Sequence, residues 1–241
     1  MDRRTFLKTV PALTVLASTG ATMGEEGGGP ATAPAPTTAG DLQPIALPRP
    51  HTDGGKSVLA ALQERKTIRN ISAQELPPQV LSDLLWAAFG VNRENGPSGR
   101  TGRTAASASN SQEIDLYVAL PAGVYLYEAV GHRLTPVVAG ELRARAGRRG
   151  AATSPVNIFY VVDIAKYSKA PFQEPGLRDT EIQKSYYYVD TGLIAGNMYL
   201  FAASQGLAAW FHNCNKEDTA REFKLRPEQR VLFAQSVGYP A

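Results

Sequence analysis

The chain has little of what covalent cross-links or metal sites need. Among its 241 residues there is one cysteine, Cys214, and there are three histidines, His51, His132 and His212. A single cysteine cannot form an intramolecular disulfide, and the histidines are isolated, without metal-ligand spacing. The sequence therefore predicts a fold without cross-links or a metal site, in which Cys214 is a small core residue.

Several catalytic and nucleotide-binding motifs are also missing. The chain contains neither G-x-G-x-x-G nor G-x-x-x-x-G-K-[ST], so the usual dinucleotide and P-loop signals are absent. No G-x-S-x-G marks a hydrolase serine, and no carboxylate pair stands out as a general acid and base. Standard motifs alone therefore identify no enzyme class.

Net charge is small once the first residues are set aside. The whole chain has 25 basic and 22 acidic side chains, a formal charge of +3. Residues 1–24 hold three of the basic and one of the acidic side chains, so the rest of the chain has 22 basic and 21 acidic side chains. We therefore expect no nucleic-acid binding. The local basic segment RARAGRR, Arg143 to Arg149, is interpreted as a solvated helix face or loop.

The N-terminus has the order of an export signal. Arg3, Arg4 and Lys8 precede an uncharged apolar run, VPALTVLASTGATM. The run is too short to span a membrane, which takes about 20 apolar residues, so we expect no stable membrane insertion. RRTFLK resembles the twin-arginine signal of bacteria. It predicts a signal peptide at 1–24, recognition by the twin-arginine export machinery, and a periplasmic or otherwise exported protein.

Composition and periodicity divide the rest of the chain. Residues 25–54 are rich in Pro, Gly and Ala, which is typical of a linker, and 55–241 form the predicted domain. Helices are predicted from 57, over 77–89, from 181 to about 206 and over 216–224. Strands are predicted at 114–120, 123–129, 156–164, 206–213 and 231–237, and a loop at 92–110. The third helix is apolar nearly all round in its second half, which predicts burial. Such a pattern favours an α+β sandwich around a mixed sheet.

The stretch ERKTIRN allows two interpretations. If the helix from Ser57 continues, Val58, Leu62, Arg65 and Arg69 form one stripe. Arginines on a core-facing stripe need an anion, and a phosphate fits their paired donors. If the helix ends near Arg65, the basic residues are solvated. Spacing alone does not decide between the two.

A family resemblance favours the interpretation in which the arginines bind an anion. ERKTIRN, LSDLLWAAFGVN, TAASASNSQ and IDLYVALPAGVYLYEAVGHRL follow one another in an order that resembles the nitroreductase family of FMN-dependent α+β oxidoreductases. The GVY-x-Y…HRL hairpin is similar to the SagB-type branch. The resemblance covers almost all of residues 56–241. It implies a three-layer sandwich with a mixed, mainly antiparallel sheet, a long buried helix, and a homodimer whose flavin pocket forms between two subunits.

The resemblance also implies which residues bind FMN. The element R-x-[ST]-x-[RK], which holds the ribityl chain and phosphate in the family, is matched by Arg65, Thr67 and Arg69, with Lys66 between them. The loop from Ala106 to Gln112 corresponds to the family's loop along the flavin ring, and its candidate contacts are Ser109, Asn110, Ser111 and Gln112. The segment around His212 and Asn213 corresponds to backbone that reaches the flavin N5 side.

The implied chemistry is ping-pong hydride or electron transfer through flavin N5 to a small-molecule substrate, with no assigned catalytic side chain. Export would separate the protein from the NAD(P)H pool, so the electron donor is unknown and is expected to be a membrane or periplasmic carrier. The alternative is a non-catalytic nitroreductase-like protein that binds a ligand or partner without flavin. Ala106 stands where the family usually has proline, and the cation that relatives supply beyond the last strand has no counterpart before Ala241.

Overall fold

The computed structural model describes residues 42–96, 99–148 and 150–241. The predicted signal peptide and residues 25–41 of the predicted linker lie outside the described residues. The rest of that linker contains a short strand, β1 (Ile45–Ala46), which pairs with β6 (Arg133–Ala139). The Pro-rich composition of this segment gave no sign of a two-residue edge strand.

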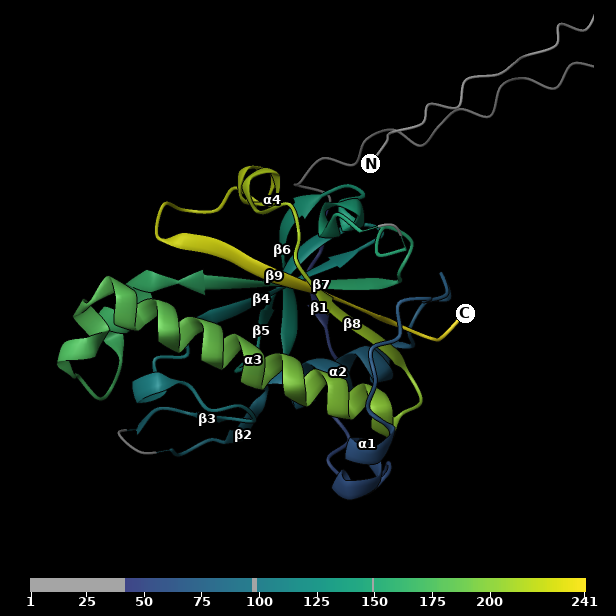
Figure 1. The fold of residues 1–241 in the computed structure, drawn as a ribbon, viewed down its shortest axis with the longest axis horizontal. Helices are drawn as coiled ribbons and strands as arrows, with labels where there is room; N and C mark the ends of the chain where they lie inside the picture. Colours follow the sequence, from purple (N-terminus) through teal and green to yellow (C-terminus); the bar gives the residue numbers. More distant parts are fainter. Residues whose placement is uncertain (1–41, 97–98, 149) are drawn as a thin grey trace, which may run out of the picture. The chain divides into compact units, whose positions relative to one another are not determined.

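A seven-stranded sheet forms the middle of the fold (Figure 1). Its order is β1-β6-β5-β4-β7-β9-β8, and every pairing among these strands is antiparallel. The central strand β7 (Val156–Asp163) has all eight residues buried, as its continuous apolar run predicts. The remaining strands are β4 (Ile114–Leu120), β5 (Gly123–Glu128), β8 (Ala208–His212) and β9 (Gln229–Gly238).

In the described residues, four α-helices cover the two faces of this sheet. Helices α1 (Val58–Glu64), α2 (Pro78–Phe89) and α3 (Thr180–Ser204) lie on one face, and α4 (Lys216–Glu222) lies on the other (Figure 1). Proline begins α2, and Asp179 caps α3 by accepting from the backbone N–H of Glu181 at 2.8 Å. The predicted three-layer α+β sandwich is confirmed. No helix in the described part of the chain has the length and hydrophobicity needed to cross a bilayer.

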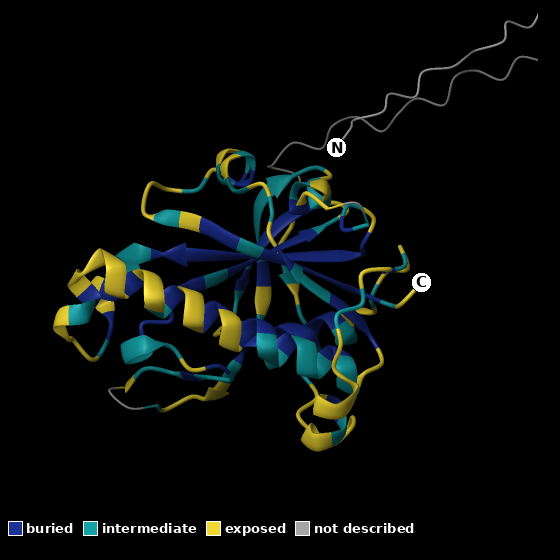
Figure 2. Cartoon of the chain, in the orientation of Figure 1, coloured by how far each residue is buried: buried dark blue, intermediate teal, exposed yellow. Residues whose placement is uncertain are grey.

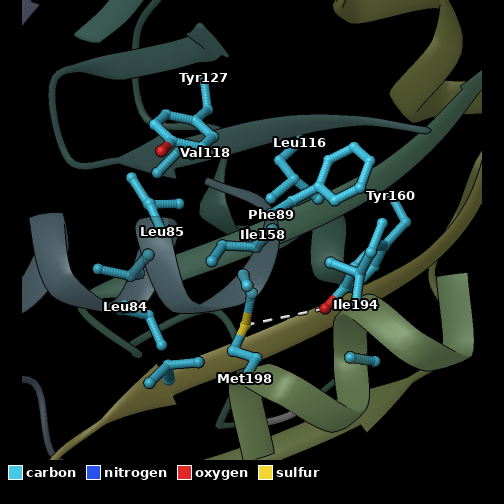
Figure 3. Close-up of a cluster of buried hydrophobic side chains, with 14 of the residues drawn as sticks. Leu84, Leu85, Phe89, Leu116, Val118, Tyr127, Ile158, Tyr160, Ile194 and Met198 are labelled. Atoms are coloured by element: carbon cyan, nitrogen blue, oxygen red, sulfur yellow. Dashed lines mark hydrogen bonds between the residues drawn. The ribbon is translucent and has the colours of Figure 1, made fainter. Parts of the chain in front are cut away.

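The main core lies between α2, α3 and the sheet (Figure 3). Leu84 and Leu85 of α2 and Ile194 and Met198 of α3 are fully buried, with 0% of their surface exposed. They pack with sheet residues such as Ile158, and the Tyr160 hydroxyl lies 3.8 Å from the Met198 sulfur. Burial of these side chains is the principal stabilising term for the fold.

Helix α3 is buried on one face only. Figure 2 shows the opposite face of the helix exposed (yellow) in its first half and half-buried (teal) in its second. Val189 is 61% exposed and Leu193 is 45% exposed. The predicted burial of the second half holds from Ile194 to Ser204, where every residue is buried or half-buried, whereas Val189 and Leu193 leave apolar side chains exposed nearer the start of the helix. Apolar residues on both faces produced the pattern, and the outward ones are left without cover.

The segment predicted as a loop at 92–110 contains regular structure. Strands β2 (Val91–Arg93) and β3 (Gly102–Arg103) form a separate two-stranded ladder. A 3-10 turn, η3 (Ala108–Asn110), follows it. Three further 3-10 turns lie in other connections: η4 (Arg143–Ala146), η5 (Ile164–Lys169) and η6 (Pro175–Arg178). Polar, glycine-rich strands this short lack the alternation on which a strand prediction depends.

Candidate functional site

Helix α1 ends before the basic residues of ERKTIRN. Arg65 is its C-cap, with a backbone N–H that donates to the Ala61 carbonyl at 2.8 Å. Val58 and Leu62 are 68% and 53% exposed. The interpretation of a buried stripe that continues through Arg65 and Arg69 is therefore wrong, and the alternative of a helix that ends near Arg65 is confirmed.

The segment that follows α1 runs beside the edge strand β8. The backbone N–H of Ile68 donates to the Ala209 carbonyl at 3.1 Å. The Thr67 hydroxyl lies 3.1 Å from the Tyr199 hydroxyl of α3, and Tyr199 also accepts from the backbone N–H of Phe211 at 2.8 Å. These contacts fix Thr67 and its neighbours between α3 and β8, so the positions of the flanking arginines are set by the fold.

Arg65 and Arg69 lie against aromatic rings at this edge. The Arg65 guanidinium is 5.6 Å from the centre of the Tyr199 ring, and that of Arg69 is 5.8 Å from the centre of the Trp210 ring. Within the described residues, neither arginine forms an ion pair with a carboxylate. Two exposed guanidiniums held by cation–π contacts keep their hydrogen-bond donors available to an external anion.

A second basic segment approaches the same edge. A Cβ at Gly150 would lie 3.6 Å from the Arg69 carbonyl, and one at Gly147 would lie 3.4 Å from the Asn215 backbone nitrogen. Both glycines have positive φ, +90° and +72°, which lets the chain turn tightly here. Gly147 and Gly150 therefore pack beside the end of β8 and beside Arg69, respectively.

This second segment adds one cation that sequence reasoning did not assign. Arg143 and Arg145 of RARAGRR are neutralised by Glu141 and Glu222. Arg148 is exposed and forms no ion pair in the described part of the chain. We name Arg65, Lys66, Arg69 and Arg148 the basic cluster. The run of arginines was the available signal, but Gly147 and Gly150, on either side of Arg148 in the sequence, meet Asn215 and Arg69 through long-range contacts.

His212 is a core residue, whereas Asn213 is at the surface. The His212 side chain is buried, with Nδ1 3.0 Å from the Asn213 carbonyl and Nε2 3.0 Å from the Ser236 hydroxyl. Burial lowers the pKa of His212, and the charge of Arg148 lowers it further. A neutral imidazole with both nitrogens engaged leaves only the backbone here, together with exposed Asn213, to meet a ligand.

The loop 107–112 has an unusual backbone. Ser109, Asn110 and Gln112 all have φ between 51° and 52°, a left-handed conformation that non-glycine residues adopt rarely. Ser107 stabilises the turn because its hydroxyl accepts from the Gln112 backbone N–H at 3.0 Å. A loop in this conformation needs support from the residues beneath it.

Within this loop, two candidate residues face inward and two remain partly exposed. Ser111 is fully buried, and Gln112, 5% exposed, donates to the Thr101 carbonyl at 2.7 Å and accepts from Arg103 at 2.8 Å. Ser109 and Asn110 are half-buried, and the Ser109 hydroxyl donates to Glu174 at 3.1 Å. The outward part of the loop is therefore Ser109 and Asn110.

The two groups of candidate residues meet different sides of α3. Tyr199 contacts Thr67, and Asp190, nine positions earlier on α3, accepts from the Ala108 backbone N–H at 2.9 Å. Nine residues are about 2.5 helical turns, so the two side chains project to opposite sides and are about 14 Å apart along the axis. One chain does not bring the basic cluster and the loop 107–112 together on one side of this helix.

A cavity of about 580 Å³ is lined in part by Thr101, whose carbonyl accepts from Gln112 of the loop 107–112. It is lined by side chains from α2, β2 and the β5–β6 turn, among them Arg49, Trp86, Arg93 and His132. The His132 ring is held by Ser82 at 2.6 Å and Tyr127 at 3.0 Å. No candidate residue from the sequence lines this cavity, and nothing in the structure assigns it a role.

Comparison with solved structures defines the class of protein. The fold matches a Ralstonia eutropha protein described as a nitroreductase, with 31% identity, a TM-score of 0.74, and coverage of 88% of this chain and 96% of that one. It also matches a chain of the E. coli microcin synthetase McbBCD complex with a TM-score of 0.60, covering 80% of this chain and 77% of that one. At 16% identity that match shows the fold alone. The class is a nitroreductase-like α+β sandwich.

The sequence comparisons give the family. The Nitroreductase family profile matches residues 62–239. A Methanocaldococcus jannaschii protein described as a nitroreductase is 25% identical over 210 residues, which are 83% of this chain and 98% of that protein. The chain belongs to the nitroreductase family, whose members are generally flavin-dependent oxidoreductases.

The residues at the edge of β8 suit the flavin typical of this family. FMN has an anionic phosphate, a hydroxylated chain and an aromatic ring. Arg65 and Arg69, cations without carboxylate partners among the described residues, match the phosphate, and the Thr67 hydroxyl matches the hydroxylated chain. The set of side chains therefore fits FMN.

Proposed function

We propose that the chain is an FMN-dependent oxidoreductase of the SagB-type branch, exported by the twin-arginine route and active as a homodimer. The observation that carries the FMN assignment is the basic cluster held beside Tyr199 and Trp210 at the edge of β8. In it, Arg65, Lys66, Arg69 and Arg148 would hold the phosphate, and Thr67 the ribityl chain. Bound FMN would supply hydride or electron transfer through its N5 atom.

Colour distinguishes this function from flavin-free ligand binding, the second candidate. The inward orientation of Ser111 and Gln112 favours that candidate, since it leaves less of the loop 107–112 for a flavin. Purified enzyme should be yellow or become yellow with FMN, because bound oxidised flavin absorbs near ~450 nm. A colourless protein that takes up no FMN would establish the flavin-free function.

Dimer formation follows from the family and from the uncovered face of α3, since nitroreductases are often dimers. Tyr188, Val189 and Leu193 form an apolar strip on that face, 45%, 61% and 45% exposed. A Cβ added at Gly192 or Gly196 would meet nothing within 4 Å, so a second backbone can approach closely. A partner chain packed across α3 would also lie close to the candidate residues on both sides of this helix.

Val189→Asp is expected to convert the dimer to a monomer, because it places a carboxylate in the apolar strip where a partner would have to desolvate it. Light scattering coupled to size-exclusion chromatography measures the mass. Val130→Asp is the matched control, since Val130 is 73% exposed on the β5–β6 turn. A dimer that survives Val189→Asp, or that both variants disrupt equally, would rule out this face.

The export signal predicts the behaviour toward nicotinamides. If the partner donor is a membrane or periplasmic carrier, FMN-loaded protein mixed with NADH or NADPH without oxygen should keep its flavin oxidised for many seconds. Stopped-flow absorbance at the flavin band is the measurement, and dithionite provides the fully reduced reference. Rapid bleaching by either nicotinamide would contradict the proposed donor while leaving the FMN assignment in place.

A further inference from the structure

Two carboxyl groups are buried beneath the loop 107–112. Glu113, directly before β4, is 0% exposed, and Asp190, on the core face of α3, is 4% exposed. Neither forms an ion pair with a basic side chain in the part of the chain that the structure describes. Two buried carboxylates without a cation are strongly unfavourable, because each loses its hydration and repels the other.

Each carboxyl group holds one end of the loop. Asp190 Oδ2 accepts from the Ala108 backbone N–H at 2.9 Å, and Glu113 Oε2 accepts from the Ser111 hydroxyl at 2.5 Å. The other oxygen of Glu113, Oε1, is buried with no hydrogen-bond partner. The loop brings the two carboxyl groups to one place, because the Ser111 backbone N–H donates to the Ala108 carbonyl at 2.9 Å. The Tyr167 hydroxyl nearby donates to the Gln183 carbonyl at 3.3 Å. One proton held between the two carboxyl groups would give them a hydrogen bond to each other, whereas two ionised carboxylates are both acceptors and have no donor between them.

We propose that Glu113 and Asp190 share a single proton, and that this protonated pair holds the loop 107–112 in its left-handed conformation. The pair acts as a positioning device, since neither side chain reaches the surface. Its consequence for cofactor binding rests on the proposed function, in which the outward part of the loop, Ser109 and Asn110, contacts the flavin.

The surroundings of the pair keep the proton in place. Burial, and then the charge of Glu113, raise the pKa of Asp190 to about 8. Burial, followed by Glu113 and Asp190, likewise raises the pKa of Tyr167, so this neighbour stays neutral. The charged groups around the loop are committed to other partners: Lys166 to Asp115, Arg100 to the Asn110 carbonyl, Arg103 to Gln112, and Glu174 to Ser109.

The sign of the pH dependence follows from the raised pKa. An aspartate carboxyl group in the unfolded chain has a pKa near 3.8, so between about pH 4 and pH 8 the folded protein binds a proton that the unfolded chain does not. The stability contributed by this proton is fully present below about pH 4 and is lost as pH rises toward 8. Above about pH 8 both states are deprotonated, and no further loss comes from this group.

Asp190→Asn tests the shared proton, because an amide can keep the hydrogen bonds of the carboxyl group but does not titrate. The amide oxygen can accept from Ala108, and the amide NH2 can donate to Glu113 Oε1, which reproduces the shared proton at every pH. In flavin-free protein, the unfolding midpoint of Asp190→Asn minus that of the wild type should increase by about 5 °C or more between about pH 5 and pH 8, then stay constant. Glu113→Gln should show the same trend and decides the matter if the first variant fails to fold.

The control is Glu75→Gln, which removes an exposed carboxyl group without an ion-pair partner among the described residues and should run parallel to the wild type at all pH values. Amide hydrogen exchange at 107–112 should accelerate above about pH 8 in the wild type, beyond the intrinsic pH effect, and not in Asp190→Asn. The proposal of a shared proton would be overturned if the unfolding midpoints of both amide variants differed from that of the wild type by an amount that does not change with pH. A pH-dependent difference in protein that binds no FMN would support the pair and count against the flavin.

Discussion

Replacing Arg65 with alanine is expected to weaken FMN binding by about 10- to 100-fold. A hydrogen bond to a charged group contributes about 1.5–3 kcal/mol, and each 1.4 kcal/mol is a tenfold change in affinity. Arg65 is held over Tyr199 and has no carboxylate partner in the described part of the chain, so its donors are available to the phosphate. Flavin fluorescence during titration of the stripped protein measures the dissociation constant.

Two comparisons make the Arg65→Ala result specific. Riboflavin, which lacks the phosphate, should bind Arg65→Ala and wild type with similar affinity. Arg133→Ala serves as the control variant, because Arg133 is paired with Glu128 at 2.6 Å on β6, toward the other edge of the sheet. Unchanged FMN affinity and stoichiometry in Arg65→Ala would reject the phosphate assignment.

Replacing Leu85 with alanine should give the largest loss of stability, about 2–5 kcal/mol. Leu85 is fully buried between α2 and the sheet, where its removal leaves a cavity in a close-packed core (Figure 3). Urea unfolding, with midpoint and slope both fitted, measures the change in the free energy of unfolding.

Leu59→Ala is the matched control for Leu85→Ala. The same atoms are deleted, but Leu59 is 78% exposed on α1, so the expected change is within about 0.5 kcal/mol. Similar losses for the two variants would show that the core between α2, α3 and the sheet has been placed wrongly.

The elements that were predictable from the sequence are those that local patterns determine. β7 follows from an unbroken apolar run, and α2 follows from proline at its start, an apolar stripe, and glycine after Phe89. The outward face of α3 could not be recognised, because periodicity cannot distinguish a side chain covered by its own core from one left for a partner.

The site was predictable only in part, for a related reason. Arg65, Thr67 and Arg69 came from a short motif, and the structure adds their placement against Tyr199 and Trp210. Gly150 beside Arg69, and Glu113 beside Asp190, are contacts between segments far apart in sequence. No local spacing contains such pairs, so they became visible only in the folded chain.

The basic cluster and the loop 107–112 meet different sides of α3, so the proposed dimer, rather than one chain, would bring them to a common flavin. Cations at the edge of β8 provide the charge, and the loop on the other side of α3 provides Ser109 and Asn110. Both are anchored to α3, through Tyr199 and Asp190, so the helix fixes their separation. The predicted twin-arginine signal is consistent with this arrangement, because that route carries proteins already folded around a cofactor.

Titration of the stripped wild-type protein with FMN and with riboflavin tests the central claim most directly. The account predicts one FMN per chain, bound at least about tenfold more tightly than riboflavin because the basic cluster recognises the phosphate. Equal affinities for the two flavins, or no uptake of FMN at all, would contradict it.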